Sequence, residues 1–223
     1  MKLFFHYCPF GFSNCYVIGS DYNEKDTLDS RREPGNNPSK RPPAREALVI
    51  DPGNMDEQIL SFIEDNEYSV LAVLVTHDHP NHVHGLRTLR RIYNMEIYGV
   101  NHIIQEIGTT MVRDGDVIRM GSFEVTVISV PGHSADSAVF RINHLLFTGD
   151  SLSAGLVGRT ASSYGAAVQM NALRSKILSL PGNYLVFPGH GPPTSLEAER
   201  RFNAGVRLYD QTRSQRPLFK VDI

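Results

Sequence analysis

The segment from Thr76 to His82 reads Thr-His-Asp-His-Pro-Asn-His and contains three histidines within six residues. Imidazole and carboxylate groups are the ligands that suit Zn²⁺ and other borderline divalent metals. The segment directly follows residues 70–75, an apolar run that predicts a strand buried on both faces. Because a rigid strand end holds side chains in fixed directions, the segment indicates a metal site. A solvated histidine-rich turn is the alternative for this segment alone.

Three later positions each place a metal-ligand side chain next to glycine at the end of an expected strand. They are His133 in Pro-Gly-His, Asp150 in Thr-Gly-Asp and His190 in Pro-Gly-His-Gly. Glycine allows backbone segments to come close to a shared centre. Each pair alone is a common turn sequence. In this order, after the histidine cluster, the three together indicate one metal centre.

Both strands and helices are predicted as the elements that position these residues. Segments rich in β-branched and aromatic residues predict strands at residues 3–5, 15–18, 47–50, 70–75, 123–130, 138–142, 145–148 and 184–187. Apolar residues at helical spacing predict helices at about residues 55–63, 82–93 and 173–180. The polar, proline-containing stretch at about residues 20–46 is interpreted as a loop insertion in a single domain spanning residues 1–223.

Composition excludes several classes of function. With 22 Lys plus Arg against 24 Asp plus Glu, the formal net charge is −2, which gives no general attraction to nucleic acid or to an anionic membrane. No apolar run approaches the length of a membrane span. The two cysteines are too few for a secreted disulfide scaffold, so a cytoplasmic location is expected. We therefore expect a small-molecule substrate, and no nucleic-acid or membrane partner.

In these motifs the sequence resembles the metallo-β-lactamase superfamily, whose pattern is His-x-His-x-Asp-His followed by a His, an Asp and a final His. Within it, the chain looks like the short glyoxalase II-like (hydroxyacylglutathione hydrolase-like) hydrolases. The supporting segments are residues 14–16, 50–53, 147–150, 158–160, 188–194 and 199–200. The resemblance implies an α+β fold, a four-layer αββα sandwich with the metals at one edge of two facing sheets.

The resemblance also implies a ligand set. One metal would be held by His77, His79 and His133, and a second would be surrounded by Asn81, His82 and His190, with Asp150 bridging both. Zn²⁺ is expected, as one or two ions, with iron or manganese as alternatives. Members of the superfamily carry Asp where this chain has Asn81, and an amide oxygen brings no negative charge to balance a cation. The second site is therefore predicted to be weakened, and Asp150 and Asn81 are the predicted catalytic residues.

A metal in such a site lowers the pKa of a bound water to about 7 and supplies hydroxide at neutral pH. A thiolate, with a pKa of about 8.5, leaves without protonation, whereas an amide nitrogen needs help. Hydrolysis of a glutathione thioester or another acyl thioester is therefore the predicted reaction. Arg159 and Tyr164 follow Asp150 in a segment that could reach over the metals, and they are predicted to contact substrate, with a surface loop as the alternative.

Two further residues near the motifs carry predictions. Asp51, at the end of its expected strand, is predicted to orient a ligand imidazole. His84 lies two residues beyond His82, about 200° around a helix, so the two rings cannot face one metal. A solvated or supporting role is therefore predicted for His84.

Three rival functions remain open from the sequence. A persulfide dioxygenase would hold one iron with His79, His133 and Asp150. A nuclease or phosphodiesterase of the same superfamily is disfavoured by the near-neutral charge. A non-catalytic metal-binding or interaction protein would explain Asn81 as a mark of lost activity. The oligomeric state is not predicted.

Overall fold

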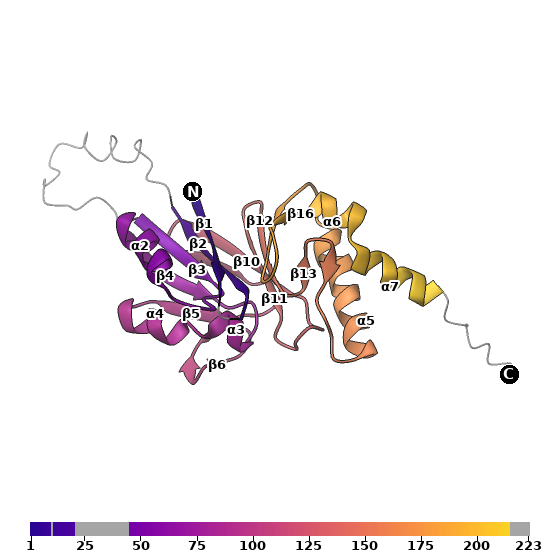
Figure 1. Ribbon diagram of the computed structural model, residues 1–223, viewed down its shortest axis with the longest axis horizontal. Coiled ribbons are helices and arrows are strands. Elements are labelled where there is room, and N and C mark those ends of the chain that lie inside the picture. The colour runs from indigo at the N-terminus through magenta and orange to yellow at the C-terminus, as the bar shows by residue number, and fades with distance from the viewer. Residues whose placement is uncertain (10, 21–44, 215–223) are drawn as a thin grey trace, which may run out of the picture.

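Two six-stranded sheets face each other in the computed structural model, which describes residues 1–9, 11–20 and 45–214 (Figure 1). The first sheet has the order β1-β2-β3-β4-β5-β8 and the second the order β16-β15-β12-β11-β10-β9. The strands of the first sheet are β1 (Lys2–Cys8), β2 (Ser13–Gly19), β3 (Arg45–Ile50), β4 (Tyr68–Leu74), β5 (Glu96–Gly99) and β8 (Thr110–Met111). Those of the second are β9 (Val117–Met120), β10 (Phe123–Ser129), β11 (Ala138–Ile142), β12 (Leu145–Gly149), β15 (Leu185–Pro188) and β16 (Thr194–Ser195).

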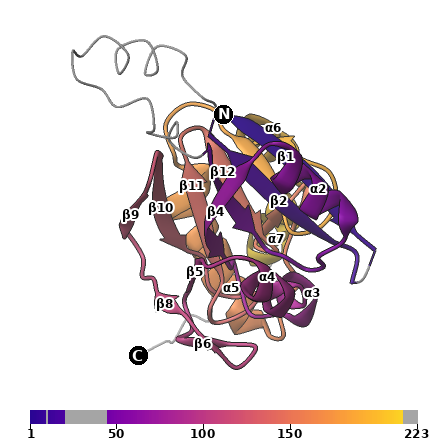
Figure 2. The same ribbon diagram turned by 90° about the vertical axis from the view of Figure 1, so that its left-hand side faces the viewer.

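Helices cover the outer face of each sheet. Figure 2 views the molecule from the side of α2 (Glu57–Asp65), α3 (Pro80–Val83) and α4 (Leu86–Ile92), which lie on the first sheet. The second sheet is covered by α5 (Ser163–Ala172), the π-helix η1 (Leu173–Leu178) and α6 (Leu196–Phe202), and α7 (Ala204–Ser214) follows. Two short hairpins complete the described part: β6 (Ile103–Ile104) with β7 (Ile107–Gly108), and β13 (Leu152–Ser153) with β14 (Leu156–Val157).

Three apolar clusters fill the spaces between these layers. In β4, Ala72 and Leu74 face the core between the sheets, while Val73 and Val75 face the cluster under α2 and α4. This alternation explains why residues 70–75 are apolar throughout: both faces of the strand are covered there. The third cluster lies between the second sheet and η1, where Leu173 is buried. The layers are therefore helix, sheet, sheet and helix, and the predicted αββα sandwich is confirmed.

Local sequence explains where the helices begin. The Asp56 side chain caps α2 by accepting from the backbone of Gln58 and Ile59, and Ile59 and Ile63 place one helical face in the core. Ser162 caps α5 in the same way through the backbone of Gly165. No helix in the described ranges combines the length and the apolarity needed to cross a bilayer.

Two predicted boundaries differ from the structure. The predicted insertion at about residues 20–46 ends too late, because Arg45 and Glu46 already pair with Tyr68 and Ser69 of the neighbouring strand β4. Residues 21–44 of the insertion lie outside the described residues, and the single domain over residues 1–223 stays a prediction. The helix predicted at about residues 173–180 is the π-helical end of a helix that begins at Ser163. Small and polar residues in its first turns hide the helical period there.

Candidate metal centre

The predicted ligands follow the ends of strands that meet at one edge of the sandwich. β3 and β4 are parallel, as are β12 and β15, so the carboxyl ends of each pair lie side by side. His77 follows β4, Asp150 follows β12 and His190 follows β15. Open α/β sheets commonly bind ligands at this carboxyl edge. The topology therefore brings together residues that are more than a hundred positions apart.

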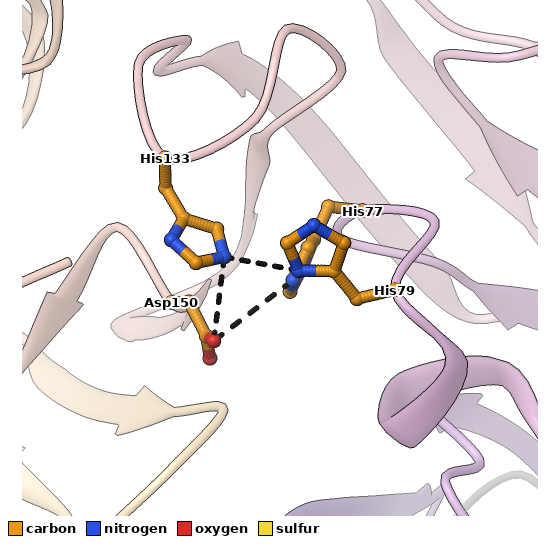
Figure 3. A group of neighbouring side chains, drawn as sticks. All are labelled: His77, His79, His133 and Asp150. Atoms are coloured by element: carbon orange, nitrogen blue, oxygen red, sulfur yellow. Dashed lines mark hydrogen bonds and ion pairs between the residues drawn. The ribbon is translucent and has the colours of Figure 1, made fainter. Parts of the chain in front are cut away.

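Four ligand atoms converge on one point, contributed by His77, His79, His133 and Asp150, which we call the first ligand group (Figure 3). The His133 Nε2 atom lies 3.1 Å from Nδ1 of His79 and 3.5 Å from Oδ2 of Asp150. The His77 Nε2 atom lies 3.9 Å from the same carboxylate oxygen. All four ligand atoms lie within 4.8 Å of one another, as the shared ligands of one metal ion do.

Three buried polar atoms at this edge lack a well-formed hydrogen bond: Nε2 of His77, and Nε2 of His82 and Oδ1 of Asp150, which face each other at 3.4 Å. Buried polar atoms without partners are costly and rare in folded proteins. A divalent cation bound by imidazole and carboxylate would satisfy these atoms, so the residues present fit the metal implied by the sequence.

The carboxylate of Asp51 anchors the outer sides of two rings. Its Oδ2 accepts from Nδ1 of His82 at 3.1 Å and from the Thr76 hydroxyl at 2.6 Å. The Thr76 hydroxyl in turn lies 3.0 Å from Nδ1 of His77. Both imidazoles therefore donate from the outer nitrogen Nδ1 and direct Nε2 at the centre. Asp51 therefore contacts His82, one of the predicted ligands, and its role in orienting a ligand imidazole stays a prediction.

A second group consists of His82, Asp150 and His190, with Asn81 beside it; we call these four the second ligand group. The Asp150 carboxylate lies 3.4 Å from Nε2 of His82 and 3.5 Å from Nε2 of His190. Nδ1 of His190 donates to the carbonyl of Phe12 at 2.7 Å, so Nε2 is left as an acceptor. The Asn81 amide nitrogen donates to that Nε2 at 2.9 Å. A metal would have to displace this hydrogen bond to reach His190.

The hairpin between β1 and β2 holds Asn81 in this position. The hydroxyl of Ser13 donates to the Asn81 carbonyl. Gly11 has φ +75°, and a Cβ there would lie 2.4 Å from Cβ of Asn81, so only glycine allows this approach. The hairpin therefore packs directly against Asn81 and limits where this residue can lie beside His190.

Burial and neighbouring charges give the histidines different protonation. Burial, assisted by His82, lowers the pKa of His77 to about 3, so its ring is neutral and ready to bind metal. Burial also acts against a charged His82, but the carboxylates of Asp150 and Asp51 outweigh it and raise the pKa of His82 to about 9. Burial likewise opposes ionisation of Asp150, but the surrounding histidines, His82 first, hold its pKa below the usual range. A metal in the second ligand group must therefore also displace a proton from His82.

The remaining predicted residues lie around this centre. The side chain of Arg159 is exposed, while its backbone carbonyl accepts from Nδ1 of His133 at 2.8 Å. Tyr164 lies in the first turn of α5 and is 79% exposed. Their contact with substrate stays a prediction. His84 is exposed at the end of α3 and belongs to none of the His, Cys, Asp and Glu groups found among the described residues.

Sequence reasoning missed two buried amides that support the site. The Asn14 amide nitrogen donates to the carbonyls of Pro188 and Gly191, on either side of His190, at 2.9 and 2.7 Å. Gln169 of α5 donates to the carbonyl of Ser151, which follows Asp150, and to that of Gly158, which precedes the Arg159 whose carbonyl holds His133. In each case the sequence shows a polar residue among apolar neighbours in a strand or helix. This pattern indicates that the residue is buried, but it does not indicate which group the residue hydrogen-bonds.

An αββα sandwich with a histidine and aspartate cluster at the edge of its sheets defines a class of metal-dependent enzymes. The Metallo-beta-lactamase superfamily matches residues 43–190, which is more than half of the chain. The chain belongs to this superfamily, as predicted.

Comparisons with individual proteins agree with this assignment. The hydroxyacylglutathione hydrolase GloC of Haemophilus influenzae is 27% identical over 184 residues, 71% of this chain and 86% of that protein. The crystal structure of ETHE1 from Myxococcus xanthus has a TM-score of 0.75 at 25% identity, covering 97% of this chain and 92% of that one. The crystal structure of TTHA1623 in a di-iron-bound form has a TM-score of 0.65 at 26% identity, covering 88% of this chain and 96% of that one.

Proposed function

We propose that this protein is a metal-dependent hydrolase that cleaves a small acyl thioester, with Zn²⁺ as the expected metal. The observation that carries the proposal is the convergence of the first ligand group around buried polar atoms that lack partners. The similarity to the hydroxyacylglutathione hydrolase GloC supports a glutathione thioester or a related acyl thioester as substrate. Iron or manganese remains the alternative metal.

A metal held by the first ligand group would activate water for attack and polarise the substrate carbonyl. The chain supplies neutral imidazoles for it: burial lowers the pKa values of His77 and His79. The outer hydrogen bonds of His77 and His133 direct their Nε2 atoms inward. Asp150 adds the one negative charge of the group. A thioester suits this arrangement because its thiolate leaves without a proton.

The second ligand group is proposed to bind metal weakly. Asn81 contributes no charge, and its amide already donates to the nitrogen of His190 that a metal would need. His82 holds a proton between the carboxylates of Asp51 and Asp150. The protein is therefore proposed to work with one tightly bound metal, or with two ions of unequal affinity.

Arg159 and Tyr164 are the proposed substrate contacts. Both side chains are exposed in the segment that follows Asp150, and the Arg159 backbone touches His133. A guanidinium at this place is suited to a carboxylate of a glutathione-like substrate. Cys8 and Cys15 are both buried free thiols, which fits the proposed cytoplasmic location.

A persulfide dioxygenase is the second candidate function. The structural similarity to ETHE1 favours it, and so does the obstruction of the second ligand group, since one iron held by His79, His133 and Asp150 would suffice. A non-catalytic metal-binding protein of the same fold is the third.

Elemental analysis of protein purified without chelator, paired with two activity assays, tests these alternatives. Zinc or manganese, with thiol release from hydroxyacylglutathione that a chelator stops and added metal restores, would support the hydrolase. Iron with oxygen consumption on glutathione persulfide would support the dioxygenase. Bound metal without either activity, both before and after Asn81→Asp, would favour a binding role. Failure to bind any divalent metal would overturn the proposal.

A further inference from the structure

Gln169 lies on the buried face of α5, between this helix and the loops that bear the first ligand group. Its side chain is 1% exposed. The amide nitrogen Nε2 donates to the backbone carbonyl of Gly158 at 3.0 Å and to that of Ser151 at 3.3 Å. Ser151 and Gly158 flank the β13–β14 hairpin and are joined by a backbone hydrogen bond from Gly158 to Ser151, so one side chain ties both ends of this hairpin to the helix.

The hydrogen bond to Gly158 leads to His133. Gly158 is joined directly to Arg159, whose carbonyl accepts from Nδ1 of His133 at 2.8 Å. That bond fixes the orientation of the ring and places its proton on the outer nitrogen. The hydrogen bond to Ser151 leads to Asp150, which is the preceding residue. Gln169 is thus linked to Asp150 through the adjacent Ser151, and to His133 through Gly158 and Arg159.

The loop before His133 packs directly on the same point of the helix. Gly132 has φ +139°, and a Cβ there would lie 2.4 Å from Cβ of Gln169 and 2.6 Å from the carbonyl of Gly165. Only glycine allows this approach. The carbon stem of Gln169 therefore sets how close the His133 loop can come, while its amide sets the position of the loop beyond Asp150.

We propose that Gln169 is a positioning residue that holds His133 and Asp150 in one fixed geometry for metal binding. The inference rests on the proposed function only in that the first ligand group is taken to bind a metal. No contact of Gln169 with substrate or metal is part of it.

The Oε1 atom of Gln169 indicates that this residue does more than fill space in the core. Its Oε1 is buried without a hydrogen-bond partner, so the amide carries a cost that an apolar side chain of equal size would not. Leu173, nearby at the η1 end of the same helix, already supplies apolar packing against the second sheet, and the neighbouring Met170 is also buried. The two hydrogen bonds donated by Nε2 are what an apolar residue could not replace.

Two nearly isosteric variants separate these roles. Gln169→Met keeps the stem and removes the donor, and Gln169→Glu keeps the shape and offers an acceptor in its place. Both are expected to weaken zinc affinity about 10- to 100-fold, measured by competition with a chromophoric chelator. Asn171→Met, at an exposed position of the same helix, is the matched control and is expected to keep wild-type affinity.

The second readout does not depend on metal or on catalysis. In ¹⁵N-labelled metal-free protein, the Nδ1 proton of His133 is expected to exchange slowly with water in the wild type and in Asn171→Met, and at least tenfold faster in both Gln169 variants. This readout keeps its meaning if thioester hydrolysis fails, so failure of the positioning role and failure of the proposed function are distinguishable.

Folded Gln169 variants with zinc affinity within twofold of wild type and an unchanged His133 proton would overturn the proposal. If both variants misfold, the wild type decides: the Gln169 amide protons and the Nδ1 proton of His133 are expected to be protected together, and both to gain protection on zinc binding. Exchange of either at the rate of an exposed group would overturn the proposal as well.

Discussion

The first and second ligand groups share Asp150 and lie side by side, yet they differ in what already occupies their ligand atoms. In the first group, the inward nitrogens of His79 and His133 are hydrogen-bonded to each other, and both belong to imidazoles that can bind a metal, while Nε2 of His77 has no hydrogen bond. In the second, the Asn81 amide donates to Nε2 of His190. Residue types alone would have counted both groups as metal sites.

The anchored imidazole rings are oriented in the same way in both ligand groups. Each anchored ring donates from its outer nitrogen: His77 to Thr76, His133 to the Arg159 carbonyl, His82 to Asp51 and His190 to the Phe12 carbonyl. The difference lies in charge and in free lone pairs. A carboxylate at position 81 would accept where the amide donates, and it would add a negative charge. A single substitution, Asn81→Asp, would therefore remove the obstruction of the second ligand group.

The largest effect is expected from Asp150→Asn, because both groups lose their shared charged ligand. We expect kcat/KM for thioester hydrolysis to fall at least about 1,000-fold and bound metal to drop to trace levels. The control is Asp65→Asn at an exposed position of α2, which should behave as wild type. Retention of tightly bound metal by the Asp150 variant would show that the centre lies elsewhere.

Asn81→Asp should remove the difference between the groups. The carboxylate cannot donate to His190, and it balances the charge of a second cation, so we expect the second ion to bind at least about 100-fold more tightly. Affinity for the first ion should change little. Isothermal titration of metal-free protein resolves the two binding steps, and Asn171→Asp serves as the control. Two equally tight ions in the wild type would contradict the obstruction of the second group.

Asp51→Asn should affect the two groups unequally. Asp51 accepts directly from His82, but it reaches His77 only through Thr76. A loss of about 10- to 100-fold in metal affinity is expected, with the second step weakened more than the first. The same titration measures both steps. An equal loss of affinity for the first and the second metal ion would mean that Asp51 stabilises the whole fold rather than His82 in particular.

The pH dependence of metal-free protein should separate His77 from His82. Burial lowers the pKa of His77 to about 3, so between about pH 3 and 6.5 only the unfolded chain binds this proton, and the free energy of unfolding rises with pH. Despite burial, the carboxylates of Asp150 and Asp51 raise the pKa of His82 to about 9. The native state therefore keeps this proton between about pH 6.5 and 9, and stability falls with pH there.

Each such proton contributes a slope of about 1.4 kcal/mol per pH unit. Urea unfolding of chelator-treated protein at a series of pH values should give a maximum near pH 6.5. The His82→Gln variant should lose the falling limb above that pH and keep the rising limb. A curve that rises steadily to pH 9 in the wild type would exclude the ion pairs of His82.

Much of the fold and of the candidate site follows from local pattern. The apolar run in β4 predicts a strand covered on both faces, and the structure confirms it. Histidine and aspartate beside glycine at strand ends predict a shared centre with the histidine cluster, and His133 and Asp150 do lie together with His77. Strand ends are predictable because a strand in a sheet has a fixed direction, and parallel neighbours end at one edge.

Hydrogen-bond partners that lie far apart in the sequence could not be predicted in the same way. Nothing near Asn81 shows that its amide faces His190, which is 109 positions away. The buried Gln169 similarly resembles any polar residue in a helix until Gly158 and Ser151 are placed beside it. Side-chain hydrogen bonds of this kind depend on packing between elements, which no local period encodes.

By itself, the sequence predicted the strands and helices from hydrophobic period and the candidate ligands from their chemistry, because both are properties of short segments, and its resemblance to the superfamily implied the αββα architecture. Only the tertiary structure decided which of those residues keep free lone pairs and which are already bonded. The physical reason is that an imidazole nitrogen has one lone pair, which either binds a metal or accepts a hydrogen bond. Packing between segments far apart in the sequence decides which of the two partners is present.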